Sequence, residues 1–211
     1  MMKAKSVSYA ILSIGAPLTL AVLEIFHPHP HDLFQLDLRT WLIVHYLQIP
    51  LFPLCALAVV ILLRGLPGIA AWFARVAMFV FAVSYVAFDT AAGVVTGILL
   101  QAAKSTSAPE QWQPAVMAVW KHPVMGGAPG SSPLLAILGS VAWSVGTTMA
   151  AWVVWRRRDS LVAAILLVVS GLGLSIFKTH AWPGGPVSFG ALSLAAAWLR
   201  WQGVDASHGD A

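Results

Sequence analysis

Long apolar runs separated by short polar segments organise this chain. The runs cover about residues 7–26, 41–63, 69–100, 134–155, 161–177 and 186–199. Most of them approach or exceed the roughly 18–20 residues that a helix needs to cross a bilayer. They lack the residue-by-residue alternation that is typical of membrane β-strands. The pattern therefore predicts an all-α integral membrane protein: one domain of six transmembrane helices over residues 1–200, followed by a polar cytoplasmic tail over 201–211.

Two of these runs depart from a plain membrane helix. The run 41–63 contains Pro50 and Pro53, which remove two backbone donors and predict a kink. The run 69–100 is longer than a bilayer requires, so the helix should tilt or extend beyond one face.

The longest polar segment, residues 101–133, contains a pattern of its own. A helix start is predicted at Pro109, and large apolar side chains then recur on one face of that helix. These side chains are Trp112, Val116, Met117 and Trp120. The pattern fits either a short helix lying in the membrane interface or a helix that packs against the rest of the protein.

Composition supports a membrane environment. Hydrophobic residues make up 59% of the 211-residue chain and charged residues only 9%, too few to cover a water-soluble surface. The formal net charge of +4 is spread over the chain, and the basic residues form no patch with aromatic residues, so we expect no nucleic-acid partner. The one cysteine, Cys55, excludes an intramolecular disulfide and a thiolate zinc site. The lipid bilayer is the expected partner.

The basic residues also predict an orientation. With the N-terminus inside, the alternating runs place eight of the twelve Lys and Arg residues on the inner side: Lys3, Lys5, Arg64, Arg75, Arg156, Arg157, Arg158 and Arg200. This excess predicts that both termini are cytoplasmic and that the protein lies in the inner (plasma) membrane. Six of the seven histidines then fall on the side that faces the periplasm or exterior: His27, His29, His31, His45, His122 and His180.

Three of those histidines lie in one motif, Glu24-Ile-Phe-His-Pro-His-Pro-His31-Asp32. A residue before proline is held in an extended conformation, and in polyproline II geometry the positions i, i+2 and i+4 fan out at roughly 120° from one another. His27, His29 and His31 therefore cannot readily converge on one ion by themselves. The motif is expected to form the outer rim of a site that other helices complete.

Two buried polar residues are the candidates to complete it. His45 lies one helical turn after Trp41, where it could ligate a metal or bond a backbone carbonyl. Asp89 lies well inside an apolar run, where a carboxylate costs roughly 2.5–3.5 kcal/mol unless something compensates for it. Asp89 fits a structural hydrogen-bonding group, a proton carrier or a residue that orients a ligating histidine. One candidate neighbour is the stripe of Ser140, Ser144 and Thr147 in the fourth run.

The first functional hypothesis is an outward-facing histidine and carboxylate pocket that binds a transition metal (zinc, copper or iron) or haem. The metal ligands would be His27, His29, His31 and His45, with Asp89 and Glu24 as the candidate catalytic residues that move protons. Such a pocket would serve a membrane metalloenzyme or redox protein acting on a small or lipid-soluble substrate. His180 and His122 are weaker candidate ligands.

Two other functions stay open. One is a proton-coupled carrier of a small solute, in which Asp89 and His45 relay the proton. The other is a non-catalytic accessory subunit that packs against membrane-protein partners or a second copy of itself. The sequence has no zinc-protease, hydrolase or phosphate-loop motif that would decide whether the protein is an enzyme.

Overall fold

A computed structural model describes residues 8–29, 32–157 and 159–203 of the chain. It is all-helical, with 79% helix and no strand among the described residues, as the apolar runs predict. The elements are η1 (Ile11–Gly15), α2 (Ala16–Ile25), η2 (Leu33–Gln35), α3 (Leu38–Leu62), α4 (Ile69–Asp89), η3 (Thr90–Val95), α5 (Thr96–Lys104), η4 (Pro109–Trp112), α6 (Gln113–Trp120), α7 (Leu134–Arg156), α8 (Leu161–Phe177) and α9 (Gly184–Trp201).

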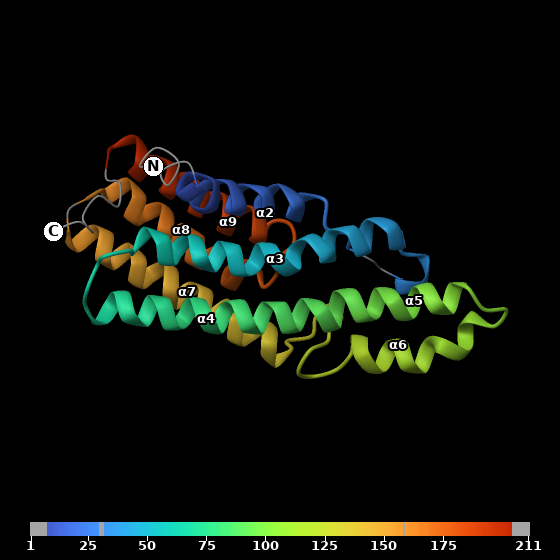
Figure 1. Cartoon of the computed structure of the whole chain (residues 1–211). Helices are drawn as coiled ribbons and strands as arrows, with labels where there is room; N and C mark the ends of the chain where they lie inside the picture. Colours follow the sequence, from blue (N-terminus) through green and yellow to red (C-terminus); the bar gives the residue numbers. More distant parts are fainter. Residues whose placement is uncertain (1–7, 30–31, 158, 204–211) are drawn as a thin grey trace.

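The long helices form a closed ring. Contacts run from α2 to α3, α4, α7, α8, α9 and back to α2, and the helices alternate in direction (Figure 1). Four aromatic rings fill the centre: Phe52, Phe81, Trp143 and Phe189 contact one another in turn, with centroids 4.6 to 6.1 Å apart. Because the ring closes between α9 and α2, the α8–α9 connection lies against the end of α2.

Four helices are long and apolar enough to cross a membrane: Ser8–Ile25, Leu38–Leu62, Ile69–Lys104 and Leu134–Arg156. Helix α8 is apolar but shorter, at 17 residues, and α9 is not among the four. Six spans and cytoplasmic termini therefore stay predictions. Outward-facing side chains such as Ile69 and Phe79, 76% and 70% exposed, give the bundle an apolar exterior that suits lipid.

The third apolar run forms one continuous helix of 36 residues, made of α4, η3 and α5. At about 1.5 Å per residue it is roughly 54 Å long, against about 30 Å for a bilayer core. Helix α5 projects beyond the bundle, with α6 folded against it (Figure 1), and the tilt or extension relative to a membrane stays a prediction. Within this helix, η3 is a π-helix, a local widening that is often found at functional sites.

The helix predicted from Pro109 is confirmed as η4 followed by α6. Its buried residues, Val116 and Trp120, pack with Leu33, Leu36, Trp41 and Leu100 in a second hydrophobic cluster. Of the two predicted alternatives, the contacts therefore favour a helix packed on protein. Pro50 and Pro53 lie inside α3, which continues as one helix through both.

Candidate metal centre

Chemically reactive side chains from four parts of the chain meet at the end of α2. Glu24 lies in the last turn of α2, and His27 follows directly. His45 comes from α3 and Asp89 from the last position of α4. His180 lies in the connection between α8 and α9. The cluster thus collects residues from the first and second halves of the sequence.

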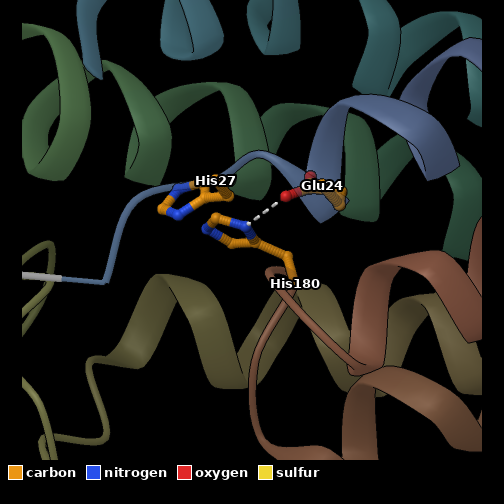
Figure 2. Close-up of side chains that lie close together, drawn as sticks. All are labelled: Glu24, His27 and His180. Carbon is orange, nitrogen blue, oxygen red and sulfur yellow. Dashed lines mark hydrogen bonds and ion pairs between the residues drawn. The ribbon is translucent and has the colours of Figure 1, made fainter. Parts of the chain in front are cut away.

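The local sequence explains how the α2 end presents its side chains. The helix closes with the Phe26 amide bonded to the Leu23 carbonyl, and residues 27–29 then have no regular structure, as expected for histidines that precede prolines. Glu24 is fully buried because it is on the inward face of the last turn, whereas Ile25 and Phe26 are exposed. The chain leaves the helix with Glu24 and His27 both turned toward His180 (Figure 2).

Glu24, His27 and His180 form the tightest group. Each offers one ligand atom, and these atoms lie within 4.8 Å of one another. Glu24 Oε2 is 3.4 Å from His180 Nδ1, and the His27 and His180 rings meet edge to face with centroids 5.0 Å apart (Figure 2). One carboxylate and two imidazoles at this spacing could hold a zinc, iron or copper ion.

Gln48 of α3 fixes the other oxygen of Glu24. Its Nε2 donates to Glu24 Oε1 over 2.9 Å, which leaves the amide oxygen Oε1 of Gln48 buried without a hydrogen-bond partner. Both carboxylate oxygens of Glu24 are therefore oriented, one by an amide and one by an imidazole. An oriented, buried carboxylate suits a group that positions or binds a ligand.

His27 is held in the form that a metal needs. Its Nδ1 lies 3.0 Å from the Pro28 carbonyl, so Nδ1 carries the proton and donates it. The other nitrogen, Nε2, is then an acceptor, and it is buried without a partner. Burial, helped by the neighbouring His180, lowers the pKa of His27 to about 3. Burial likewise lowers the pKa of His180 to about 4, so both imidazoles are neutral at pH 7.

His45 is arranged like His27, with one ring nitrogen donating to a backbone carbonyl and the other left as an acceptor. Its Nδ1 donates to the Trp41 carbonyl over 2.7 Å, and its ring lies 4.9 Å from that of His27. The free nitrogen Nε2 faces Asp89 Oδ1 at 3.8 Å, which is too long for a hydrogen bond. The second oxygen of Asp89, Oδ2, is buried and has no hydrogen-bond partner.

Two glycines make room for the cluster. A Cβ on Gly93, in the π-helix η3, would lie 1.8 Å from His45 Cδ2. The Gly93 carbonyl also accepts a 2.8 Å hydrogen bond from Trp41 Nε1, which locks the ring that stacks on His45. A Cβ on Gly185 would lie 1.8 Å from the His180 carbonyl oxygen and 2.7 Å from Glu24 Cγ. The backbone is therefore shaped around the imidazoles.

The structure gathers some of the residues that the sequence predicts. Glu24, His27, His45 and Asp89 come together, whereas His29 is exposed and only its ring edge approaches His27, at 5.8 Å between centroids. His31 lies outside the described residues. This placement leaves the predicted ligand roles of the four histidines untested.

His180 was underrated by sequence analysis. Its sequence signals are its position on the same predicted side of the membrane as the other histidines and its place beside Trp182 and Pro183, which rank it only slightly above His122. His122 lies elsewhere, in the loop after α6, where its Nδ1 accepts from the Val124 amide.

The charges of the cluster are unusual for a buried site. Among the described ion pairs, Glu24 lies opposite His180 and Asp89 opposite His45, and Asp159 pairs with Arg157. Two buried carboxylates surrounded by imidazoles with free acceptor nitrogens form a site that attracts cations. Comparisons of the chain with protein-family models, with curated proteins and with solved structures found no match.

Proposed function

We propose that the chain is an integral membrane protein that binds a divalent transition metal through Glu24, His27 and His180. The observation that carries this proposal is a compact set of ligand atoms that includes a buried acceptor without a donor. Five buried side-chain atoms of the described residues have no hydrogen-bond partner, and His27 Nε2 is the one that belongs to the proposed ligand set, whose three ligand atoms lie within 4.8 Å of one another. Leaving such atoms unpaired costs roughly 1–3 kcal/mol each, and a cation would compensate for that cost.

The donor set supports a metal ion rather than haem. Two imidazoles and one carboxylate match the three-residue sets of catalytic zinc and non-haem iron, which leave coordination positions open for water or substrate. The imidazole rings pack against one another, with His27 4.9 Å from His45 and 5.0 Å from His180 between centroids. That separation suits adjacent ligands of an ion and leaves no space for a porphyrin between the rings.

A metal held here would supply Lewis acidity to a bound water or substrate oxygen. The protein's own groups would do the rest. Gln48 and His180 keep the Glu24 carboxylate in one orientation, with contacts of 2.9 and 3.4 Å. Asp89 is the carboxylate outside this ligand set that could take a proton, as expected for a membrane metalloenzyme or redox protein. Aromatic rings of Phe52 and Phe88 lie against His180 and limit access by water.

We place the protein in the inner membrane with this centre on the periplasmic or exterior side. The excess of Lys and Arg on the predicted cytoplasmic side supports that orientation. Four helices with the length and hydropathy of membrane spans support the membrane location. The lipid bilayer and a small or lipid-soluble substrate are the partners that fit a buried centre near the bundle end.

Metal analysis of the purified protein tests the proposal. The full chain would be prepared in detergent without chelators and examined by elemental mass spectrometry and visible absorption. We expect stoichiometric zinc, iron or copper without a haem band, and loss of at least half of that metal in His180→Ala. His122→Ala is the matched control, because it removes a histidine outside the cluster. A metal-free wild-type protein, or equal metal content in both variants, would contradict the proposal.

The geometry of Asp89 favours one second candidate, the proton-coupled carrier. Asp89 faces His45 across 3.8 Å, has an unpaired oxygen, and borders the π-helix η3, which is a point where the helix could bend. The carrier predicts a proton flux in liposomes that Asp89→Asn abolishes and that addition of chelator leaves unchanged. Proton flux that is absent from wild-type liposomes would exclude this candidate.

A further inference from the structure

We propose that His45 and Asp89 hold a second divalent cation, so that the centre is dinuclear. This inference rests on the proposed function, because the second ion would lie beside the one bound by Glu24, His27 and His180. It assigns a ligand role to Asp89 and a separate position to His45.

The first step concerns the tautomer of His45. Its Nδ1 donates to the Trp41 carbonyl over 2.7 Å, one helical turn back in α3, so its proton is on Nδ1. Nε2 is left with a lone pair that points at Asp89. Metal-bound histidines commonly have this arrangement, in which the nitrogen opposite the metal donates to a carbonyl or carboxylate. Stacking of the Trp41 indole on the ring, at 4.1 Å between centroids, fixes the direction of that lone pair.

The second step concerns the gap between His45 and Asp89. Nε2 and Oδ1 are two acceptors that face each other across 3.8 Å. A shared proton would draw them to roughly 2.7–3.0 Å, and a bridging water would hold them about 4.5 Å apart. A cation that lies about 2.0–2.2 Å from each atom spans the observed distance with an obtuse angle at the metal.

The third step concerns the surroundings of the pair. Asp89 is 1% exposed and His45 3% exposed, and Asp89 Oδ2 has no hydrogen-bond partner. Asp89 therefore has a second oxygen available for the same ion. The buried, unpaired Oε1 of Gln48 lies three residues after His45 on the same helix, where the side chains share a face. Ligands of this kind, one imidazole and several oxygens, suit zinc, iron or manganese.

The fourth step concerns how the second ion would lie relative to the ion bound by Glu24, His27 and His180. Glu24 is already engaged by Gln48 and His180, so the second ion would depend on Asp89 for its carboxylate, and each ion would then have one carboxylate of its own. The rings of His27 and His45, one from each position, lie 4.9 Å apart between centroids. Two metals in enzymes with paired ions are typically about 3.5–4 Å apart, which is compatible with ligand rings that touch.

Counting the bound ions tests this inference. The full-length protein in detergent would be stripped of metal and titrated with Co²⁺ alone, followed by visible absorption, and its Zn²⁺ content after dialysis would be measured by elemental mass spectrometry. We expect two equivalents in the wild type. We expect one equivalent in Asp89→Asn and one in His45→Gln, which retain the size of the original side chains. Asp159→Asn, the matched control, removes a carboxylate that pairs with Arg157 and should retain two.

The outcomes separate the two proposals. Saturation of the wild type at one equivalent would overturn the second ion and leave the proposed metal site standing. Zero equivalents would overturn both. Retention of two equivalents by both Asp89→Asn and His45→Gln, with elution profiles and helix content like the wild type, would show that the second ion does not depend on this pair. A magnetic interaction between two Co²⁺ ions in the wild type, absent from Asp89→Asn, would support the inference.

Discussion

Two groups of polar side chains lie inside this helix bundle, and they are built on opposite principles. One is the proposed metal centre around Glu24, His27, His45, Asp89 and His180. The other is a hydroxyl seam along α7 and α8, formed by Ser140, Ser144, Thr147, Ser170 and, at its exposed edge, Ser175. Both groups insert polar atoms between apolar helices. Most polar atoms of the seam have hydrogen-bond partners within the protein, whereas fewer of those in the centre do.

The seam uses backbone carbonyls as its partners. Ser144 Oγ contacts the Ser140 and Gly171 carbonyls and the Ser175 hydroxyl, at 2.5 to 3.0 Å. Thr147 Oγ1 donates to the Trp143 carbonyl over 2.9 Å. Because a hydroxyl is neutral and can return to the carbonyl four residues back, it adds little cost inside a membrane helix and joins neighbouring helices. The Ser170 hydroxyl is the exception, with no hydrogen-bond partner.

The acceptor atoms of the proposed metal centre do not find hydrogen-bond donors within the protein in this way. His27 and His45 each use Nδ1 for a backbone carbonyl, His27 Nε2 is buried without a partner, and Asp89 retains an unpaired oxygen. Carboxylates and acceptor nitrogens cannot satisfy one another without a proton or a cation between them. Most hydroxyls of the seam are therefore satisfied as folded, with Ser170 as the exception, whereas the acceptors of the proposed metal centre would be satisfied by a bound cation. The predictions below separate the two.

The largest expected difference between the two regions is in how each makes the stability of the protein depend on pH. An unfolded histidine has a pKa near 6.5, whereas the pKa of folded His27 is about 3 and that of His180 about 4. Between these values the unfolded forms of these two histidines bind more protons, so His27 and His180 together should contribute a loss of several kcal/mol of stability to the metal-free protein as the pH falls from 7 to 4. Thermal melts of chelator-treated protein at three pH values would measure this loss. Glu24, His29 and His45 are the titratable groups that face these two rings.

The seam contains no group that titrates in this range, so Ser144→Ala should show the same pH slope as the wild type. Replacement of both His27 and His180 by Gln should flatten the slope. An unchanged slope in that double variant would mean that the acid sensitivity arises outside the centre.

Metal loading should stabilise the protein by the next largest amount. A ligand at about 100 times its dissociation constant raises the free energy of unfolding by about 2.7 kcal/mol. We expect this increment in the wild type and in Ser144→Ala, measured by thermal melts with and without Zn²⁺, and its loss in His180→Ala. An equal increment in His180→Ala would indicate that the ion binds elsewhere.

Gly93→Ala should lower the free energy of unfolding by a smaller amount, through a clash confined to the surroundings of His45. The added Cβ would lie 1.8 Å from His45, so the ring or the π-helix must move, at a cost of about 1–3 kcal/mol. Gly190→Ala is the control, since its Cβ would meet Ala21 Cβ at an ordinary 3.9 Å. Denaturation of both variants measures the difference, and equal stability would contradict the tight contact at Gly93.

The sequence alone predicts the long helices and identifies some residues of the centre. Apolar runs predict the long helices because burial and lipid exposure both demand them, and the run that is too long for a bilayer correctly predicts the extended α4–α5 helix. Glu24, His45 and Asp89 stand out because a polar group inside an apolar run needs a reason to be there. These residues can be identified without knowledge of the packing.

Partners across the bundle cannot be identified in that way. His180 is 156 residues from Glu24, and only closure of the helix ring brings the α8–α9 connection against the end of α2. The stripe of Ser140 and Ser144 was a candidate neighbour of Asp89, but it contacts Tyr85 and α8. Spacing along one helix defines a face, whereas the order of helices around the ring decides what that face meets.

Glu24→Gln should have opposite effects with and without metal. In metal-free protein at neutral pH it removes a buried carboxylate whose histidine partner, His180, is neutral, so stability should rise by about 1 kcal/mol or more. With metal present the variant should bind at least about tenfold more weakly, since a ligand or its orienting group is lost. Melts and competition with a coloured chelator measure the two effects. Glu110→Gln, at an exposed position, should change neither.

The smallest effect belongs to the seam itself. Ser144→Ala removes the hydroxyl that joins α7 to the Gly171 carbonyl and the Ser175 hydroxyl, which should cost about 1 kcal/mol with no change in metal content. Because carbonyls keep their helix bonds, the loss stays modest. Thermal melts and elemental analysis on the same preparation test both halves of the expectation. If Ser144→Ala lost metal, the seam and the centre would be energetically coupled through Tyr85, whose hydroxyl lies 2.9 Å from Ser140 Oγ and whose ring packs 5.8 Å from His180.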